Sequence, residues 1–131
     1  MTRLPLRTAL CGVLALLGLA WASPAQPGPA PQPGAQLWLQ CRACHSLKAG
    51  ESDKTGPNLN RVFGARAATL RKDYAYSPAL KASGIVWDEA TLDAWLRQPA
   101  GLVRGNRMAF GGIADPAKRK ALIAWLKRET R

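Results

Sequence analysis

The chain has few of the residues from which metal clusters and disulfide frameworks are built. Its 131 residues include three cysteines and one histidine, His45. A zinc module needs a second pair of cysteine or histidine ligands, yet the only thiol besides Cys41 and Cys44 is Cys11. Cys11 lies in an N-terminal segment that we expect to be removed, so no cysteine is left for a structural disulfide. The composition therefore argues against a zinc module and against a disulfide-stabilised scaffold.

Long hydrophobic runs and strand-like alternation are also missing. No internal repeat occurs, and no long alternation of apolar and polar residues indicates a sheet. The apolar run at residues 9–19 is shorter than the ~20 residues that a membrane-spanning helix needs. It follows Arg3 and Arg7 and precedes Ala20-Trp21-Ala22, a small-x-small cleavage pattern. Residues 1–22 are therefore predicted to be a secretory signal peptide, with a retained membrane anchor as the alternative.

Residues 23–34 are rich in proline, with prolines at positions 24, 27, 29, 31 and 33. This composition cannot bury apolar surface and favours extended, polyproline-like conformations. We interpret the segment as a flexible leader. The remaining residues, 35–131, are enough for one domain.

Acidic side chains are scarce, with 8 Asp and Glu against 19 Lys and Arg and a formal charge of +11. Loss of Arg3 and Arg7 with the signal peptide would lower this charge to +9. A charge of this sign favours partner proteins with acidic docking faces, the alternative being a basic surface that only aids solubility. Nucleic acid is not an expected partner, because export removes the protein from it and no groove-reading motif is present.

The most informative stretch is Cys41-Arg42-Ala43-Cys44-His45, a C-x-x-C-H run that is the attachment signature of c-type haem. Two thiols three positions apart can each form a thioether to one edge of a porphyrin. The adjacent imidazole of His45 then lies under the iron as its proximal ligand. A thioredoxin-like dithiol is the rival interpretation, but it requires a strand before the motif, where this chain has its Pro-rich segment.

Met108 is the natural ligand for the opposite side of the iron. It is the only methionine besides the initiator, and no second histidine exists. A thioether opposite an imidazole favours ferrous iron and raises the reduction potential. The alternative is that Met108 merely fills an apolar gap.

Capping signals predict short helices separated by long loops. Ser77-Pro78 and Asp115-Pro116 each pair a capping residue with proline at the first helical position. Asp88 caps a third helix that ends before Pro99, and in it Asp93 and Arg97 are spaced for an i,i+4 ion pair. The expected helices span 35–43, 77–82, 88–98 and 115–129, and the expected loops span 46–76 and 98–114. Such loops would need a large apolar cofactor to complete their core.

Together these motifs resemble those of the class I cytochromes c over nearly all of residues 37–127. The resemblance is carried by Cys41-Arg42-Ala43-Cys44-His45, Thr55-Gly56-Pro57-Asn58-Leu59, Tyr74-Ala75-Tyr76-Ser77, Gly84-Ile85-Val86-Trp87, Gly105-Asn106-Arg107-Met108-Ala109-Phe110 and Leu122-Ile123-Ala124-Trp125-Leu126. It implies an all-α cytochrome c fold, with three to four short helices and long loops around one covalently attached haem c. In this fold the first and last helices cross.

The resemblance also implies roles for individual residues. Pro57 would offer its carbonyl to the His45 ring, and Tyr76 and Trp87 would hold the haem propionates. Phe110 would cover the haem edge beside Met108. Further residues would line the pocket or, if Ala65 is an insertion, face the propionates: Leu59, Leu92, Leu96 and Arg66.

The chain also departs from the family pattern. Arg104 stands where the methionine loop usually begins with proline, and Trp95 replaces a tyrosine common near the sulfur. Pro33 takes the place of an early helical glycine, so docking against Trp125 is expected to depend on Gly34 and on Trp38.

The predicted protein is a monomeric, periplasmic, one-electron carrier with His/Met-ligated haem iron, and it is not an enzyme. The metal ligands would be His45 and Met108, and no stable membrane insertion of the mature domain is expected. Two alternatives remain. One is a haem subunit of a periplasmic dehydrogenase or oxidase complex. The other is a ligand-binding sensor or peroxidase-like protein in which the Met108 bond is labile.

Overall fold

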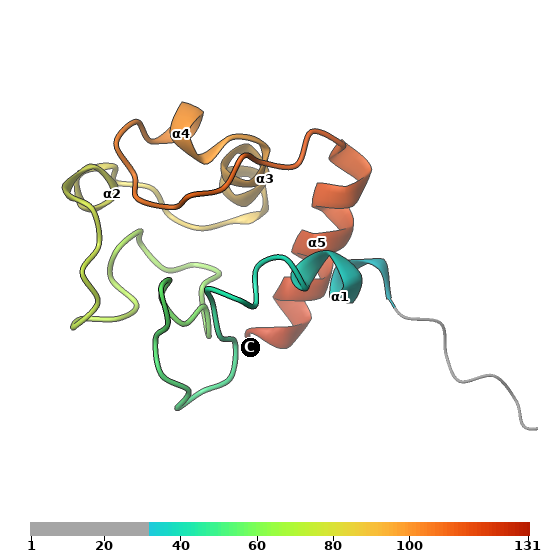
Figure 1. The fold of residues 1–131 in the computed structure, drawn as a ribbon, viewed down its shortest axis with the longest axis horizontal. Helices are drawn as coiled ribbons and strands as arrows, with labels where there is room; N and C mark the ends of the chain where they lie inside the picture. Colours follow the sequence, from blue (N-terminus) through green and yellow to red (C-terminus); the bar gives the residue numbers. More distant parts are fainter. Residues whose placement is uncertain (1–31) are drawn as a thin grey trace, which may run out of the picture.

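The computed structural model describes residues 32–131, which form five helices joined by long loops (Figure 1). The predicted signal peptide at 1–22, and the leader up to residue 31, lie outside the described residues. The helices are α1 (Pro33–Trp38), α2 (Pro78–Ala82), α3 (Glu89–Arg97), α4 (Pro99–Leu102) and α5 (Pro116–Glu129). Between residues 32 and 131 there is no strand, only an isolated bridge between Arg66 and Val86. The predicted all-α class is confirmed.

Three of the helices begin at the capping residues that the sequence indicates. The Ser77 hydroxyl accepts from the backbone N–H of Leu80 at the start of α2. Asp88 and Thr91 form a reciprocal capping box at the start of α3. Asp115 accepts from two N–H groups at the start of α5. Because these side chains satisfy N–H groups that the helix leaves unpaired, they fix where each helix starts.

Two details of the predicted helices are wrong. The first helix spans Pro33–Trp38 rather than 35–43, and the chain then passes through tight turns that carry the Cys41 to His45 motif. The second is the one-turn helix α4, which lies inside a stretch predicted to be a loop. Pro99 ends α3 as expected, but its fixed φ also suits the first position of a new helix.

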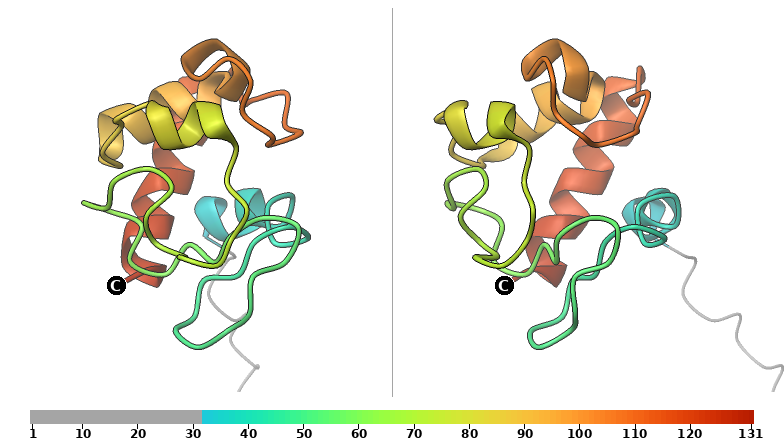
Figure 2. Two further views of the ribbon diagram at one scale, coloured as in Figure 1. Left: turned by 90° about the vertical axis from the view of Figure 1, so that its left-hand side faces the viewer. Right: turned by 60° about the vertical axis from the view of Figure 1, so that its left-hand side comes forward.

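The first and last helices cross, as the resemblance implied. Gly34 permits the close approach, because a Cβ at this position would lie 2.2 Å from the Cβ of Trp125. The rings of Trp38 and Trp125 pack beside it with centroids 5.9 Å apart. Figure 2 shows α2, α3 and α4 gathered at one end of the molecule, the loop 46–76 at the other, and α5 running between them.

Helix α5 also packs against α3, but through an ion pair that the sequence did not predict. Asp93 does not pair with Arg97 one turn away; its Oδ1 lies 2.7 Å from Nε of Arg119 on α5. The Arg119 side chain is only 7 % exposed, so its positive charge needs a nearby counter-charge. Within residues 32–131, no helix is long and apolar enough to cross a membrane.

Candidate functional site

A cavity of about 270 Å³ lies between α3, α5 and the loops. Its walls are largely apolar, with Leu59, Leu92 and Leu96 among them as the resemblance implied. The eight residues that the sequence assigned to a cofactor all line this one cavity, although they come from separate segments of the chain. They are Cys41, Cys44, His45, Pro57, Tyr76, Trp87, Met108 and Phe110.

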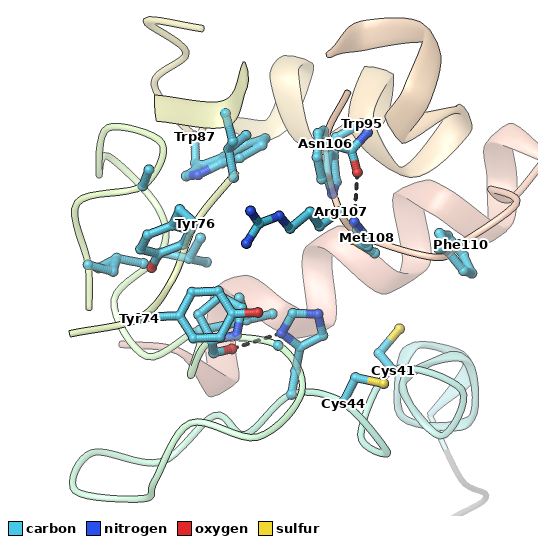
Figure 3. Close-up of a pocket in the computed structure, with 18 of the residues that line it drawn as sticks. Cys41, Cys44, Tyr74, Tyr76, Trp87, Trp95, Asn106, Arg107, Met108 and Phe110 are labelled. Atoms are coloured by element: carbon cyan, nitrogen blue, oxygen red, sulfur yellow. Dashed lines mark hydrogen bonds between the residues drawn. The ribbon is translucent and has the colours of Figure 1, made fainter. Parts of the chain in front are cut away.

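The two thiols lie on the same side of the cavity (Figure 3). The turn after α1 places them there, because Cys41 N–H bonds to Trp38 O at 2.8 Å and Cys44 N–H bonds to Cys41 O at 3.0 Å. Cys41 is half-buried, whereas Cys44 is exposed. Burial, and then the neighbouring Cys44, raise the pKa of Cys41 to about 11, so its thiol is protonated at neutral pH.

His45 is held in a defined orientation and tautomer. Its Nδ1 lies 2.8 Å from the Pro57 carbonyl, which can only accept, so Nδ1 carries the proton and Nε2 keeps a free lone pair. The backbone of Gly56 packs directly against the His45 ring, so closely that a Cβ at residue 56 would lie 2.4 Å from Cε1 of the ring. Burial lowers the pKa of His45, although the bond to Pro57 opposes this shift. The ring is therefore neutral at neutral pH, the form that a metal requires.

The loop that carries Pro57 is fixed by a buried asparagine. Asn58 is 2 % exposed and donates to the carbonyls of Lys48 and Glu51 at 2.8 and 2.9 Å. Its own N–H donates to Asp53, whose carboxylate also pairs with Arg71 at 2.9 Å. Sequence reasoning quoted Asn58 in a motif but gave it no role, and it missed the Asp53–Arg71 pair. No sequence signal marks that pair, because its members lie 18 residues apart in the loop between α1 and α2.

Met108 enters the cavity from the loop that follows α4. Asn106 shapes this loop, because its Oδ1 accepts from Met108 N–H at 2.9 Å while its Nδ2 donates to Val103 O at 2.8 Å. In Figure 3 Met108 and Asn106 lie across the cavity from Tyr74. Arg104, the residue in place of the usual proline, is exposed at the start of this loop.

The aromatic residues around the cavity pack in pairs. Trp95 is buried, and its ring meets that of Trp87 edge-on with centroids 5.3 Å apart. Tyr76 is buried and packs edge-on against Tyr74, with centroids 4.8 Å apart. Burial raises the pKa of Tyr76, so its hydroxyl stays protonated and can donate.

Two cationic side chains also line the cavity. One is Arg66, which the resemblance placed beside the propionates if Ala65 is an insertion. Sequence reasoning quoted Arg107 in a motif but did not place it in the cavity. Its guanidinium projects into the cavity (Figure 3) and donates to Ala75 O at 3.3 Å. With the Tyr76 hydroxyl and the Trp87 indole, they offer hydrogen-bond donors suited to carboxylate groups.

This donor set fits one c-type haem. Two free thiols open onto the cavity, an imidazole with a free Nε2 follows them in the chain, and a thioether lines the same space. Gly56 leaves room for the imidazole, because a Cβ at residue 56 would overlap the ring. Apolar walls suit a porphyrin, and the cluster of donors suits its propionates.

Comparisons with known proteins agree with this arrangement, although no family model matches the chain. The chain is 38 % identical over 115 residues to cytochrome c2 of Rhodomicrobium vannielii, an alignment that covers 86 % of this chain and 91 % of that protein. It is 41 % identical over 99 residues to cytochrome c of Arabidopsis thaliana, with coverages of 75 % and 88 %. The solved structure of cytochrome cH from Methylobacterium extorquens is similar with a TM-score of 0.69 and 43 % identity, and covers 73 % of this chain and 95 % of its own.

The chain therefore belongs to the class I cytochromes c. It has the cytochrome c fold and is an electron-transfer protein that acts with redox partners, not an enzyme. It carries one covalently attached haem c, for which Cys41 and Cys44 have the attachment spacing.

Proposed function

We propose that this cytochrome is a periplasmic one-electron carrier in which His45 and Met108 are the two iron ligands. When bound, the haem supplies the chemistry, because its iron gains and loses a single electron. The observation that carries the proposal is that an oriented, neutral imidazole and a thioether line one cavity with the thiol pair. With His45 and Met108 as its two protein ligands, the iron would not need to bind a substrate.

Each ligand has a support that suits its role. The Pro57 carbonyl holds the proton on Nδ1 of His45, which leaves Nε2 for the iron and makes the ring a stronger donor. Asn106 holds the backbone of Met108 through one hydrogen bond. A thioether opposite an imidazole favours ferrous iron, so the protein would have a raised reduction potential.

The remaining cavity residues would bind the cofactor and exclude water. Cys41 and Cys44 would attach it, and Phe110 would cover its edge beside the methionine. Tyr76 and Trp87 would donate to the propionates, which need polar partners when they are buried. The pocket residues Leu59, Leu92 and Leu96 would keep the site dry.

Exposed cations would guide the carrier to acidic faces on its redox partners. Arg97 and Arg104 are exposed, and Arg42 is exposed inside the attachment motif. Electrostatic steering of this kind raises association rates by roughly 10- to 10³-fold at low salt. Secretion by the N-terminal signal peptide would place a monomer in the periplasm.

The test is the visible spectrum of the reduced, haem-loaded protein before and after addition of carbon monoxide. We expect an unchanged low-spin spectrum, because Met108 would stay bound to the iron and keep carbon monoxide from it. The same protein with Met108→Ala should bind carbon monoxide rapidly, which controls for access of the gas. Rapid formation of a carbonyl adduct by the unaltered protein would instead support a ligand-binding sensor and reject the carrier.

A further inference from the structure

Within residues 32–131 one charged side chain is buried, and it lies outside the cavity. Arg119, in the first turns of α5, is 6 % exposed. A buried guanidinium is costly unless its N–H groups are paired and a counter-charge is close. The partners of Arg119 therefore indicate what this residue holds in place.

Arg119 joins three parts of the molecule through one guanidinium. Its Nε and Nη2 donate to the two carboxylate oxygens of Asp93 on α3, at 2.7 and 3.3 Å. Its Nη1 donates to the carbonyls of Ile113 and Ala114, both at 2.8 Å. These two carbonyls lie at the end of the loop that carries Met108. The ion pair thus connects α3 and α5 to that loop.

Two further contacts anchor the loop at the same place. Ile113 N–H donates to Leu96 O near the end of α3 at 2.8 Å. Gly112 has a φ of +97° and lies so close to α3 that a Cβ there would come within 2.1 Å of Arg97 O. Ile113 follows Met108 closely in the chain, so a displacement of residues 112–114 would be passed on to the methionine.

We propose that Asp93 and Arg119 are positioning residues for the iron ligand Met108. The carboxylate keeps the guanidinium inside the protein, and the guanidinium keeps the two loop carbonyls in place. The inference rests on the proposed ligation of iron by Met108. Without the carboxylate, Arg119 would lose its counter-charge and turn towards solvent, which would free the end of the loop.

The chain offers a matched control, because a second ion pair joins the same two helices. Glu89 on α3 and Lys127 on α5 pair at the surface, with side chains 63 % and 51 % exposed. In the described part of the chain, no hydrogen bond joins either side chain of this pair to residues 112–114. Glu89→Gln therefore removes a link between α3 and α5 without altering the support of the loop.

The experiment compares haem-loaded wild type, Asp93→Asn and Glu89→Gln. It measures the sulfur-to-iron charge-transfer absorption of the ferric protein and the rate of carbon monoxide binding to the ferrous protein, at temperatures where circular dichroism shows intact helices. We expect Asp93→Asn to weaken the absorption and to speed carbon monoxide binding by about tenfold, the effect of losing one charged hydrogen bond. Glu89→Gln should match the wild type in both.

A second variant guards against failure of Asp93→Asn to fold. Arg119→Lys keeps a positive charge near Asp93, but a single ammonium group cannot bind the carboxylate and both carbonyls as the guanidinium does. This variant should therefore also weaken the absorption. If both variants keep the wild-type absorption and rate, the positioning role is wrong while ligation by Met108 stands. If the wild type itself lacks the absorption, both the ligation and this inference fail.

Discussion

Replacement of Gly34 by alanine tests the crossing of α1 and α5, on which the placement of the attachment motif depends. A Cβ at residue 34 would lie 2.2 Å from Trp125 Cβ and 2.6 Å from Ala121 O. Both atoms are fixed to the backbone of α5, so neither can rotate away. The two helices would have to separate, which would also disturb the packing of Trp38 on Trp125.

The expected cost of Gly34→Ala is about 3 kcal/mol, at the upper end of the range for overpacked cores. For a domain of this size each kcal/mol lowers Tm by roughly 4–8 °C, so a fall of more than about 10 °C is expected. Denaturant unfolding of the haem-loaded protein, followed by circular dichroism, should show a lower midpoint with an unchanged m-value.

Gly111→Ala is the matched control for this substitution. A Cβ on Gly111 would meet no atom within 4 Å, and the φ of this residue is not positive. Alanine at such a site stabilises by about 0.4–1 kcal/mol, because it restricts the unfolded chain. The two glycines should therefore shift stability in opposite directions. Equal stability of Gly34→Ala and wild type would refute the close crossing.

Three further predictions concern the core, a helix cap and the surface. Leu122→Ala should cost about 2.7–5 kcal/mol in denaturant unfolding, because this side chain is 0 % exposed. The bond to Thr91 N–H lowers the pKa of Asp88, so its capping contribution should be present above the unfolded pKa and be lost as pH falls through the folded value. Asp88→Asn keeps the acceptor and should flatten that part of a stability–pH curve; an unchanged curve would contradict the assignment. Oxidation of the ferrous protein by ferricyanide should slow as ionic strength rises, because salt screens the basic surface, and a rate independent of salt would count against steering.

The attachment motif could be predicted because its chemistry requires neighbours in the chain. Cys41, Cys44 and His45 have to reach one porphyrin from a single turn, so their spacing carries the information. The helix starts at Ser77 and Asp88 could also be predicted from the sequence, because a capping side chain binds N–H groups two or three residues away. Comparison with relatives confirms the family that these local patterns indicated.

Pairings between distant segments could not be predicted from local patterns. Asp93 has a cation at the right helical spacing in Arg97, yet it pairs with Arg119, 26 residues along the chain. The same holds for Asp53, which pairs with Arg71, 18 residues further along the same loop. Such choices depend on which charge is buried when the helices pack, because a buried guanidinium needs its counter-charge far more than an exposed one does.

The sequence by itself determined which cofactor this protein carries, because the spacing for thioether attachment is encoded in residues that lie close together in the chain. Only the tertiary structure decided how those residues are held. Gly34 meets Trp125, and Pro57 meets His45, because the folded chain brings them within contact distance. The physical reason is that covalent chemistry is set by residue type and spacing, whereas burial and orientation arise only when separate segments pack together.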